Sequence, residues 1–128
     1  MPMKTDLGLY ILVNGREPRR ITDALLWGQW MATARRHVGD TCLHGKIDRK
    51  KHTVRISTVF LGSDHGFWEK DKPPVLFETM VFGGPNQGDQ RRYCTWDEAV
   101  KGHQEWVERE LVLWPDDQVT IEHPVMAS

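Results

Sequence analysis

Two carboxylates and a histidine are the side chains with which this chain could do chemistry. Asp64 and His65 follow the strand-forming run STVFLG at 57–62, and Glu78 lies inside the apolar run VLFETMVF at 75–82. An adjacent Asp and His could serve as a general base with its orienting group, or as two metal ligands. The alternative is a turn, in which Asp64 accepts backbone N–H groups and His65 is solvated.

Glu78 is notable because a carboxylate in the middle of a buried strand needs a hydrogen-bond donor or a charged partner. If Leu61 pairs with Val75 across the preceding loop, Glu78 lies opposite Thr58. The basic residues that could contact it are Arg55, Arg91 and Arg92. A buried glutamate with a raised pKa would mark a site. The alternatives are a hydrogen-bonded structural glutamate, or one on the solvent face of the sheet.

Other motifs with a known chemistry are missing from the sequence. Cys42 and Cys94 belong to no C-x-x-C pair, which indicates two reduced thiols rather than a zinc site. The glycine-rich run at 83–92 leads into a strand and lacks the Lys-Ser/Thr of a phosphate-binding loop, so it predicts a plain connection. His103 lies on the apolar stripe of a helix, which is typical of a core histidine. We expect no metal and no cofactor.

Strands and two helices must position these residues. We predict strands at 8–13, 41–47, 53–61, 75–82 and 91–94, with a short edge strand at 118–123. Asn14-Gly15 and the DRKK run at 48–51 indicate turns, and Pro18 is expected to prevent further strand pairing. One helix runs from Thr22 or Asp23 to about His37, with Arg35 to His37 in its last turn and Gly39 as its stop. Its apolar stripe is predicted to consist of Leu26, Trp30, Ala34 and His37 or Val38, widened by Leu25, Trp27 and Met31. The other runs from Thr95 to about Leu113, and Thr95 with Glu98 fits a capping box.

This order, β-α-β-β-β-β-α, predicts an α+β fold. An antiparallel sheet of four or five strands would be covered by two helices, with both helices on one face. We expect residues 1–128 to form a single domain whose last residues, 120–128, are a frayed tail.

The loop at 62–74 is longer than a typical hairpin loop, which has about two to five residues. It carries Phe67 and Trp68, and the chain has six tryptophans in 128 residues. Long loops tend to be functional, and exposed aromatic residues often contact partners. We therefore predict that Asp64, His65, Phe67 and Trp68 belong to a surface that binds a ligand or partner.

Composition narrows the class of partner. The net charge of −1 and the pI near 6.6 argue against a nucleic-acid binder, which needs an excess of basic residues. No apolar run approaches the ~20 residues of a membrane-spanning helix, and no signal peptide is evident. We expect a cytoplasmic protein that does not bind membranes.

Three phrases in the sequence resemble those of a known group. ISTVFLGSDHGF, PPVLFETMVFGG and RRYCTWDEAVKGH, which lie between residues 56 and 103, are similar to small uncharacterised proteins encoded in tailed-phage and prophage genomes. The resemblance implies an accessory protein in the cytoplasm of an infected bacterial host cell. Such proteins bind a host protein, block a defence system or sequester a nucleotide signal. It implies no catalytic residue.

Two hypotheses about function follow. The first is a non-enzymatic binding protein that contacts a host or phage macromolecule, or forms a homodimer, through the 62–74 loop and exposed tryptophans. The second is a protein that binds or hydrolyses a small, nucleotide-like ligand with Asp64, His65, Glu78 and nearby arginines. The first is favoured because no strong catalytic constellation is present.

Overall fold

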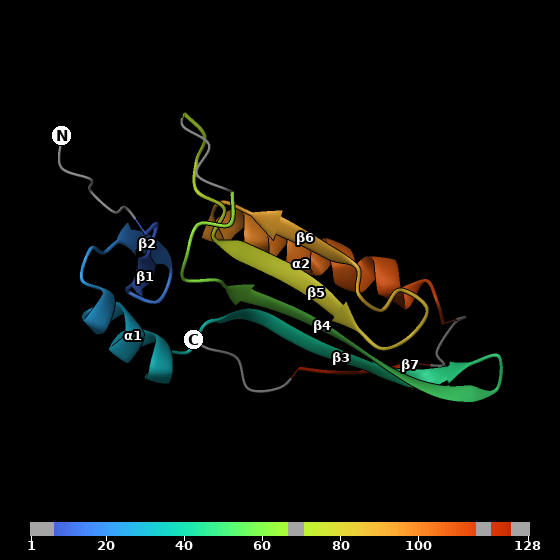
Figure 1. The fold of residues 1–128 in the computed structure, drawn as a ribbon. Coiled ribbons are helices and arrows are strands. Elements are labelled where there is room, and N and C mark those ends of the chain that lie inside the picture. The colour runs from blue at the N-terminus through green and yellow to red at the C-terminus, as the bar shows by residue number, and fades with distance from the viewer. Residues whose placement is uncertain (1–6, 67–70, 115–118, 124–128) are drawn as a thin grey trace.

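A long antiparallel hairpin forms the centre of the main sheet (Figure 1). The computed structural model describes residues 7–66, 71–114 and 119–123. Strands β3 (His37–Ile47) and β4 (Lys50–Phe60) are joined by Asp48 and Arg49, whose φ angles are 50° and 69°. Two consecutive positive φ angles match the twist of a two-residue hairpin turn. The turn is therefore shorter than the predicted one, because strand pairing continues to Lys50.

The other strands of the sheet pair on either side of this hairpin. β5 (Phe77–Phe82) lies next to β4, β6 (Gln90–Tyr93) lies next to β5, and β7 (Val119–Glu122) lies next to β3. All four pairings are antiparallel. β7 is the edge strand that the sequence predicts at 118–123, and it includes residues that we also assigned to a frayed tail. Residues 124–128 lie outside the described residues.

Helix α2 (Trp96–Leu111) covers one face of the sheet (Figure 1). The predicted capping box is confirmed: the Glu98 N–H donates to Thr95 Oγ1, and the Thr95 N–H donates to Glu98 Oε1, each at 3.1 Å. Five residues of α2 are buried: Ala99, Gly102, His103, Trp106 and Glu110. Ala99 belongs to one apolar cluster, with Phe60 and Phe77, and Trp106 belongs to a second, with Leu43 and Ile56.

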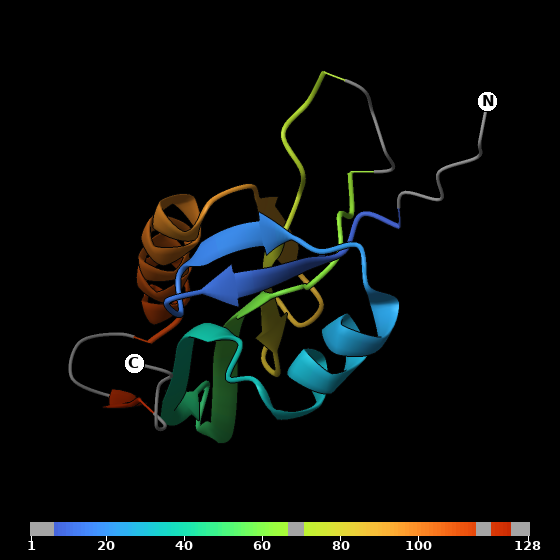
Figure 2. The ribbon, with the colours of Figure 1, turned by 90° about the vertical axis from the view of Figure 1, so that its left-hand side faces the viewer.

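Helix α1 (Ala24–Thr33) lies at the end of the sheet, beside a separate hairpin of β1 (Tyr10–Val13) and β2 (Glu17–Arg20) (Figure 2). The predicted α+β class, with its antiparallel sheet and two helices, is confirmed. The expectation that both helices lie on one face of the sheet is wrong, because α1 packs beside the β1–β2 hairpin at the end of the sheet. Within the described residues, no helix is both long enough and apolar enough to cross a membrane.

The prediction that Pro18 prevents strand pairing is wrong. Pro18 lies opposite Leu12 in the β1–β2 hairpin, where Asn14 and Gly15 have positive φ angles and form the predicted turn. β2 is an edge strand, and an edge strand tolerates a residue without an N–H.

The predicted C-terminal end of the first helix is also wrong. The helix ends at Thr33, Ala34 is extended, and β3 begins at His37, so Gly39 lies in a strand. Pairing with β4 accounts for the early stop. The Arg36 carbonyl accepts the Phe60 N–H at 2.8 Å, and Arg36 Nη1 donates to the Phe60 carbonyl at 3.1 Å.

Candidate functional site

Asp64 and His65 hold the two ends of the long loop together. Asp64 Oδ1 accepts the Gly66 N–H at 2.8 Å and the Val75 N–H at 2.9 Å. The His65 N–H donates to the Val75 carbonyl at 2.9 Å, and its ring Nε2 lies 3.3 Å from Ser63 Oγ. The Asp64 contacts are those of the turn interpretation, with its carboxylate engaged by backbone donors. Phe67 and Trp68 lie outside the described residues.

Glu78 forms an ion pair on the face of the sheet away from α2. Its Oε2 accepts from Arg92 Nε at 2.9 Å, and Arg92 is its register partner on β6. The predicted register is wrong by one residue, because Glu78 lies opposite Val59 rather than Thr58. Both backbone groups of Val75 bond to Asp64 and His65, so Leu61 donates to the Leu76 carbonyl instead.

Asp64 lines a cavity that His65 and Glu78 do not line. This cavity has a volume of about 300 Å³, and Asp64 lines it together with Gly66, Lys72, Pro73, Val75 and Cys94. The joint action of Asp64, His65 and Glu78 on a ligand therefore stays a prediction. Among the described residues, no group of three or more histidine, cysteine, aspartate or glutamate side chains is placed to hold a metal ion.

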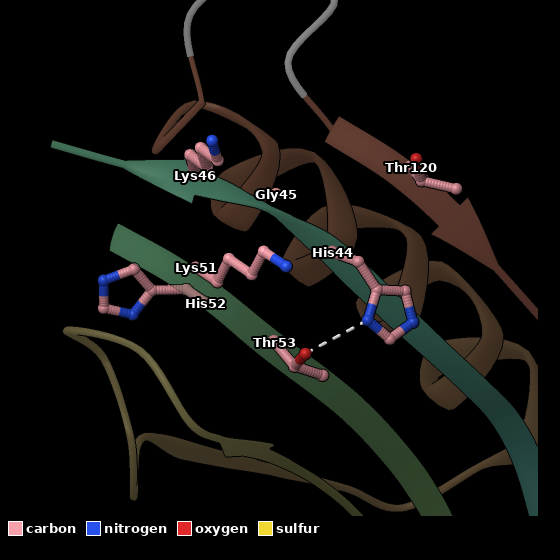
Figure 3. Close-up of a pocket in the computed structure, with 7 residues that line it drawn as sticks. All are labelled: His44, Gly45, Lys46, Lys51, His52, Thr53 and Thr120. Atoms are coloured by element: carbon pink, nitrogen blue, oxygen red, sulfur yellow. Dashed lines mark hydrogen bonds between the residues drawn. The ribbon is translucent and has the colours of Figure 1, made fainter. Parts of the chain in front are cut away.

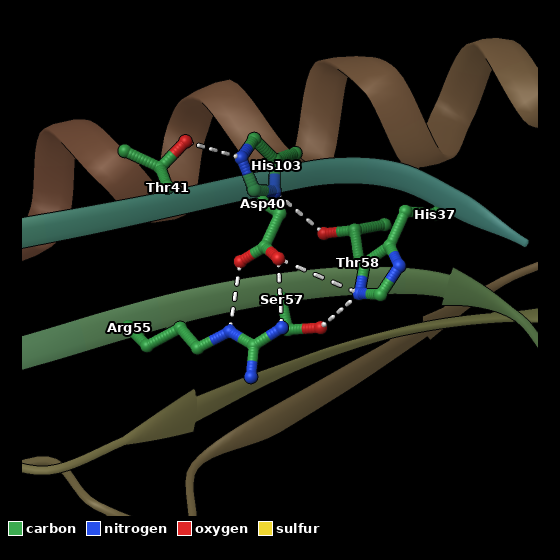
Figure 4. Close-up of polar contacts among 7 residues, drawn as sticks. All are labelled: His37, Asp40, Thr41, Arg55, Ser57, Thr58 and His103. Atoms are coloured by element: carbon green, nitrogen blue, oxygen red, sulfur yellow. Dashed lines mark hydrogen bonds and ion pairs between the residues drawn. The ribbon is translucent and has the colours of Figure 1, made fainter. Parts of the chain in front are cut away.

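A chain of buried polar side chains crosses the sheet beneath α2 (Figure 4). The ring of His103 lies between Thr41 Oγ1, 2.9 Å from Nε2, and Thr58 Oγ1, 2.7 Å from Nδ1. Thr58 continues to Thr79 at 2.5 Å, and the Tyr93 hydroxyl donates to Thr79 at 3.0 Å. Burial lowers the pKa of His103 to about 4, although Asp40 opposes this change.

These hydrogen-bonded side chains hold α2 in one position on the sheet. A Cβ atom at Gly39 would lie 2.6 Å from the His103 ring, and one at Gly102 would lie 2.2 Å from the Tyr93 hydroxyl. Both glycines therefore permit close approach of the helix and the strands. The sequence indicated a core histidine, but not its threonine partners. Threonines on the apolar faces of β3, β4 and β5 were the available signal.

The opposite face of β3 and β4 carries a second polar group (Figure 4). Arg55 Nε and Nη2 donate to Asp40 Oδ1 and Oδ2 at 2.8 and 2.7 Å. This paired hydrogen bond lowers the pKa of the buried Asp40. His37 Nε2 lies 3.7 Å from Asp40 Oδ2 and 3.3 Å from Ser57 Oγ.

The serine, histidine and aspartate of this group do not have the geometry of a catalytic triad. In a triad the carboxylate binds one ring nitrogen and the serine hydroxyl binds the other. Here Ser57 and Asp40 both face Nε2 of His37, and both oxygens of Asp40 are engaged by Arg55. The paired hydrogen bonds of Arg55 with Asp40 join β4 to β3.

Helix α1 is attached to the end of the sheet along one side only. Asp23 caps it by accepting the N–H groups of Leu25 and Leu26 at 3.0 and 3.1 Å. Trp27 Nε1 donates to the Gly62 carbonyl at 2.9 Å, and the Trp30 ring packs edge-on against Phe60 at 5.8 Å. These contacts explain why two of the six tryptophans lie in this helix.

The remaining surface of α1 is exposed and uncharged, and it includes two leucines. The helix sequence ALLWGQWMAT contains no charged residue, and none of its residues is buried. Leu25 is 72% exposed and Leu26 is 52% exposed. We call these two residues, with the neighbouring exposed Ala24, the α1 apolar surface. Sequence periodicity had assigned Leu25 and Leu26 to a buried stripe, and that assignment is wrong because the two tryptophans make the attachment instead.

Comparison of the chain with protein-family models, with curated proteins and with solved structures found no match.

Proposed function

We propose that this chain is a non-enzymatic binding protein that contacts a host or phage protein through the α1 apolar surface. The exposure of Leu25 and Leu26 on an uncharged helix is the observation that carries the proposal. Single exposed apolar residues are ordinary, but adjacent ones on one helix commonly mark an interaction surface. A helix with one apolar side already attached can present its other side to a groove in a partner.

Charge around the helix favours an acidic partner. Between residues 7 and 36 the chain has five arginines and two acidic residues, Glu17 and Asp23. The arginines are Arg16, Arg19, Arg20, Arg35 and Arg36. An apolar patch bordered by carboxylates would complement this region and would associate faster at low salt. Two copies of the chain would bring like charges together, so we favour a different protein over a homodimer.

The resemblance to accessory proteins of phage and prophage genomes supports the same proposal. It implies that the chain acts in the cytoplasm of an infected bacterium, where host proteins are available partners. The partner is then a host or phage protein with an acidic border around an apolar groove.

Site-specific photocrosslinking tests the proposal. A photoreactive phenylalanine analogue replaces Leu25 in one protein and Val112 in another, and both are used in host lysate. Val112 is a matched control because it is also apolar, lies at the end of α2 and is 82% exposed. We expect a product of defined mass from position 25 and none of that mass from position 112.

Affinity measurements with the purified partner complete the test. The L25E/L26E variant should bind about 30-fold more weakly, as expected for the loss of an interface hot spot. The V112E variant should bind like the unmodified chain, and both variants should unfold normally because the changed residues are exposed. Equal affinity for all three proteins would refute the proposal. A crosslinked product with twice the mass of the chain would show that the partner is a second copy of the chain rather than a different protein.

A further inference from the structure

A basic groove lies at the far end of the β3–β4 hairpin from α1 (Figures 1 and 3). It has a volume of about 550 Å³ and is lined by His44, Gly45, Lys46, Lys51, His52, Thr53 and Thr120. No acidic residue is part of this lining. Its volume falls within the ~300–1,000 Å³ that small-molecule sites occupy in proteins.

Two lysines of the groove occupy opposite positions on neighbouring strands. Lys46 on β3 is the register partner of Lys51 on β4, so their side chains share a face of the sheet. Both are exposed, and neither forms an ion pair with any described residue. Like charges directly opposite each other destabilise a strand pair. A bound anion between the two ammonium groups would remove that repulsion.

The adjoining row of residues offers hydrogen-bond donors on the same face. His44 lies opposite Thr53 on one side and opposite Thr120 on the other. His44 Nδ1 is 3.1 Å from Thr53 Oγ1, whereas Nε2 has no hydrogen-bond partner among the described residues. If the Thr53 hydroxyl donates to Nδ1, Nε2 carries the proton. Nε2 is buried, so it can donate to a ligand only after neighbouring side chains move. Figure 3 shows Lys51 extended toward His44 and His52 turned away.

We propose that this groove binds the phosphate groups of a small phosphorylated molecule such as a nucleotide. Lys46 and Lys51 neutralise the phosphate charge, and His44 with Thr53 and Thr120 supplies polar contacts beside it. The groove is much larger than one phosphate ion, so the rest of the ligand occupies the remaining volume. This proposal does not depend on the function proposed for α1, which lies at the opposite end of the sheet.

One acidic residue stands close to the groove. Glu122 Oε2 lies 4.0 Å from His44 Nε2, and the Glu122 side chain is 66% exposed. Because it is exposed, it can move away when an anion binds. Its charge would still weaken phosphate binding, so a neutral residue at this position should strengthen it.

Isothermal titration calorimetry at low salt tests the proposal with defined probes. The probes are ATP, inorganic pyrophosphate, inorganic phosphate, adenosine and a mixed-sequence DNA oligonucleotide. We expect ATP to bind, pyrophosphate to bind more weakly, and adenosine not to bind. The K46Q/K51Q variant should bind ATP at least about tenfold more weakly, and the E122Q variant should bind it more tightly.

A control variant separates a local site from general attraction. R16Q/K101Q also removes two exposed positive charges, and neither position lines the groove. It should bind ATP like the unmodified chain. K46Q/K51Q should also raise the midpoint of thermal unfolding by about 2–4 °C without ligand, because it removes the like-charge pair. That increase would show that the variant folds.

Four results would overturn the proposal. They are no binding of any probe at about 1 mM, equal losses in both double variants, binding of the oligonucleotide alone, or equal binding of ATP and adenosine. The L25E/L26E variant should bind ATP normally. Failure of this site therefore leaves the α1 proposal standing, and loss of the α1 interaction leaves this one standing.

Discussion

The buried ring of His103 should make the stability of this protein fall with acid over a defined pH range. The residue is 8% exposed, and its ring lies between two threonine hydroxyls and stays neutral until the pH approaches its pKa of about 4. In the unfolded chain a histidine takes up its proton near the ordinary value of 6.5. Between these two values the unfolded state binds more protons than the folded state. Stability therefore decreases as the pH is lowered from about 6.5 to about 4, and His103 contributes no pH dependence above 6.5.

The size of this effect follows from the two values. Each pH unit between them corresponds to about 1.4 kcal/mol, so the full loss is on the order of 3 kcal/mol. That is a large part of the stability of a typical single domain. The Asp40 carboxyl acts in a lower range. Arg55 lowers its pKa below 3.8, so the stability from that pair is lost only as the pH falls below that value.

The assay is urea unfolding followed by tryptophan fluorescence, carried out at several pH values between about 4 and about 8. The H103Q variant cannot titrate at this position, so its unfolding free energy should vary less between pH 6.5 and 4 than that of the unmodified chain. H52Q serves as the control, because it removes a histidine that is not part of the buried hydrogen-bonded group around His103. If H103Q and the unmodified chain lose the same free energy over this range, the reasoning is refuted. An NMR titration that placed the His103 pKa near 6.5 would refute it independently.

Three further predictions use the same unfolding assay. G102A should lower stability by about 1–3 kcal/mol, because the new Cβ would overlap the Tyr93 hydroxyl, and this outweighs the better helix propensity of alanine. Equal or higher stability of the variant would contradict the close packing of α2 on the sheet. R55Q should lower stability by about 1.5–3 kcal/mol at neutral pH, because the buried Asp40 loses its charged partner while Arg55 itself is partly exposed. This loss should shrink well below pH 3.8, and a pH-independent loss would argue against the ion pair. T95A should lower stability by about 1 kcal/mol through loss of the α2 cap, whereas T95S should change it little; equal losses in both would exclude capping as the cause.

The local features of the fold could be predicted from the sequence because they depend on neighbouring residues. The Asn14-Gly15 turn, the Asp23 cap of α1 and the Thr95 capping box of α2 each require only a few adjacent side chains and their own backbone. The apolar runs of β4 and β5 were also informative, because short apolar runs bounded by turn residues are typical of strands inside a sheet. Together they were sufficient to predict an α+β fold.

Other features depended on residues far apart in the chain. The register of β4 and β5 differs from the prediction by one residue because the Asp64 and His65 contacts engage Val75. The end of α1 was decided by the pairing of residue 36 with Phe60, which the helical pattern does not contain.

The candidate sites depended most on the tertiary structure. Leu25 and Leu26 fit a buried stripe by spacing, and only the attachment of α1 through Trp27 and Trp30 leaves them exposed. Lys46 and Lys51 are part of an ordinary polar hairpin by sequence, and only the strand register places their charges opposite each other. The types of side chain were thus present in the sequence. Which of them meet, and which face solvent, was decided by contacts between distant segments, because burial and pairing depend on the packed chain.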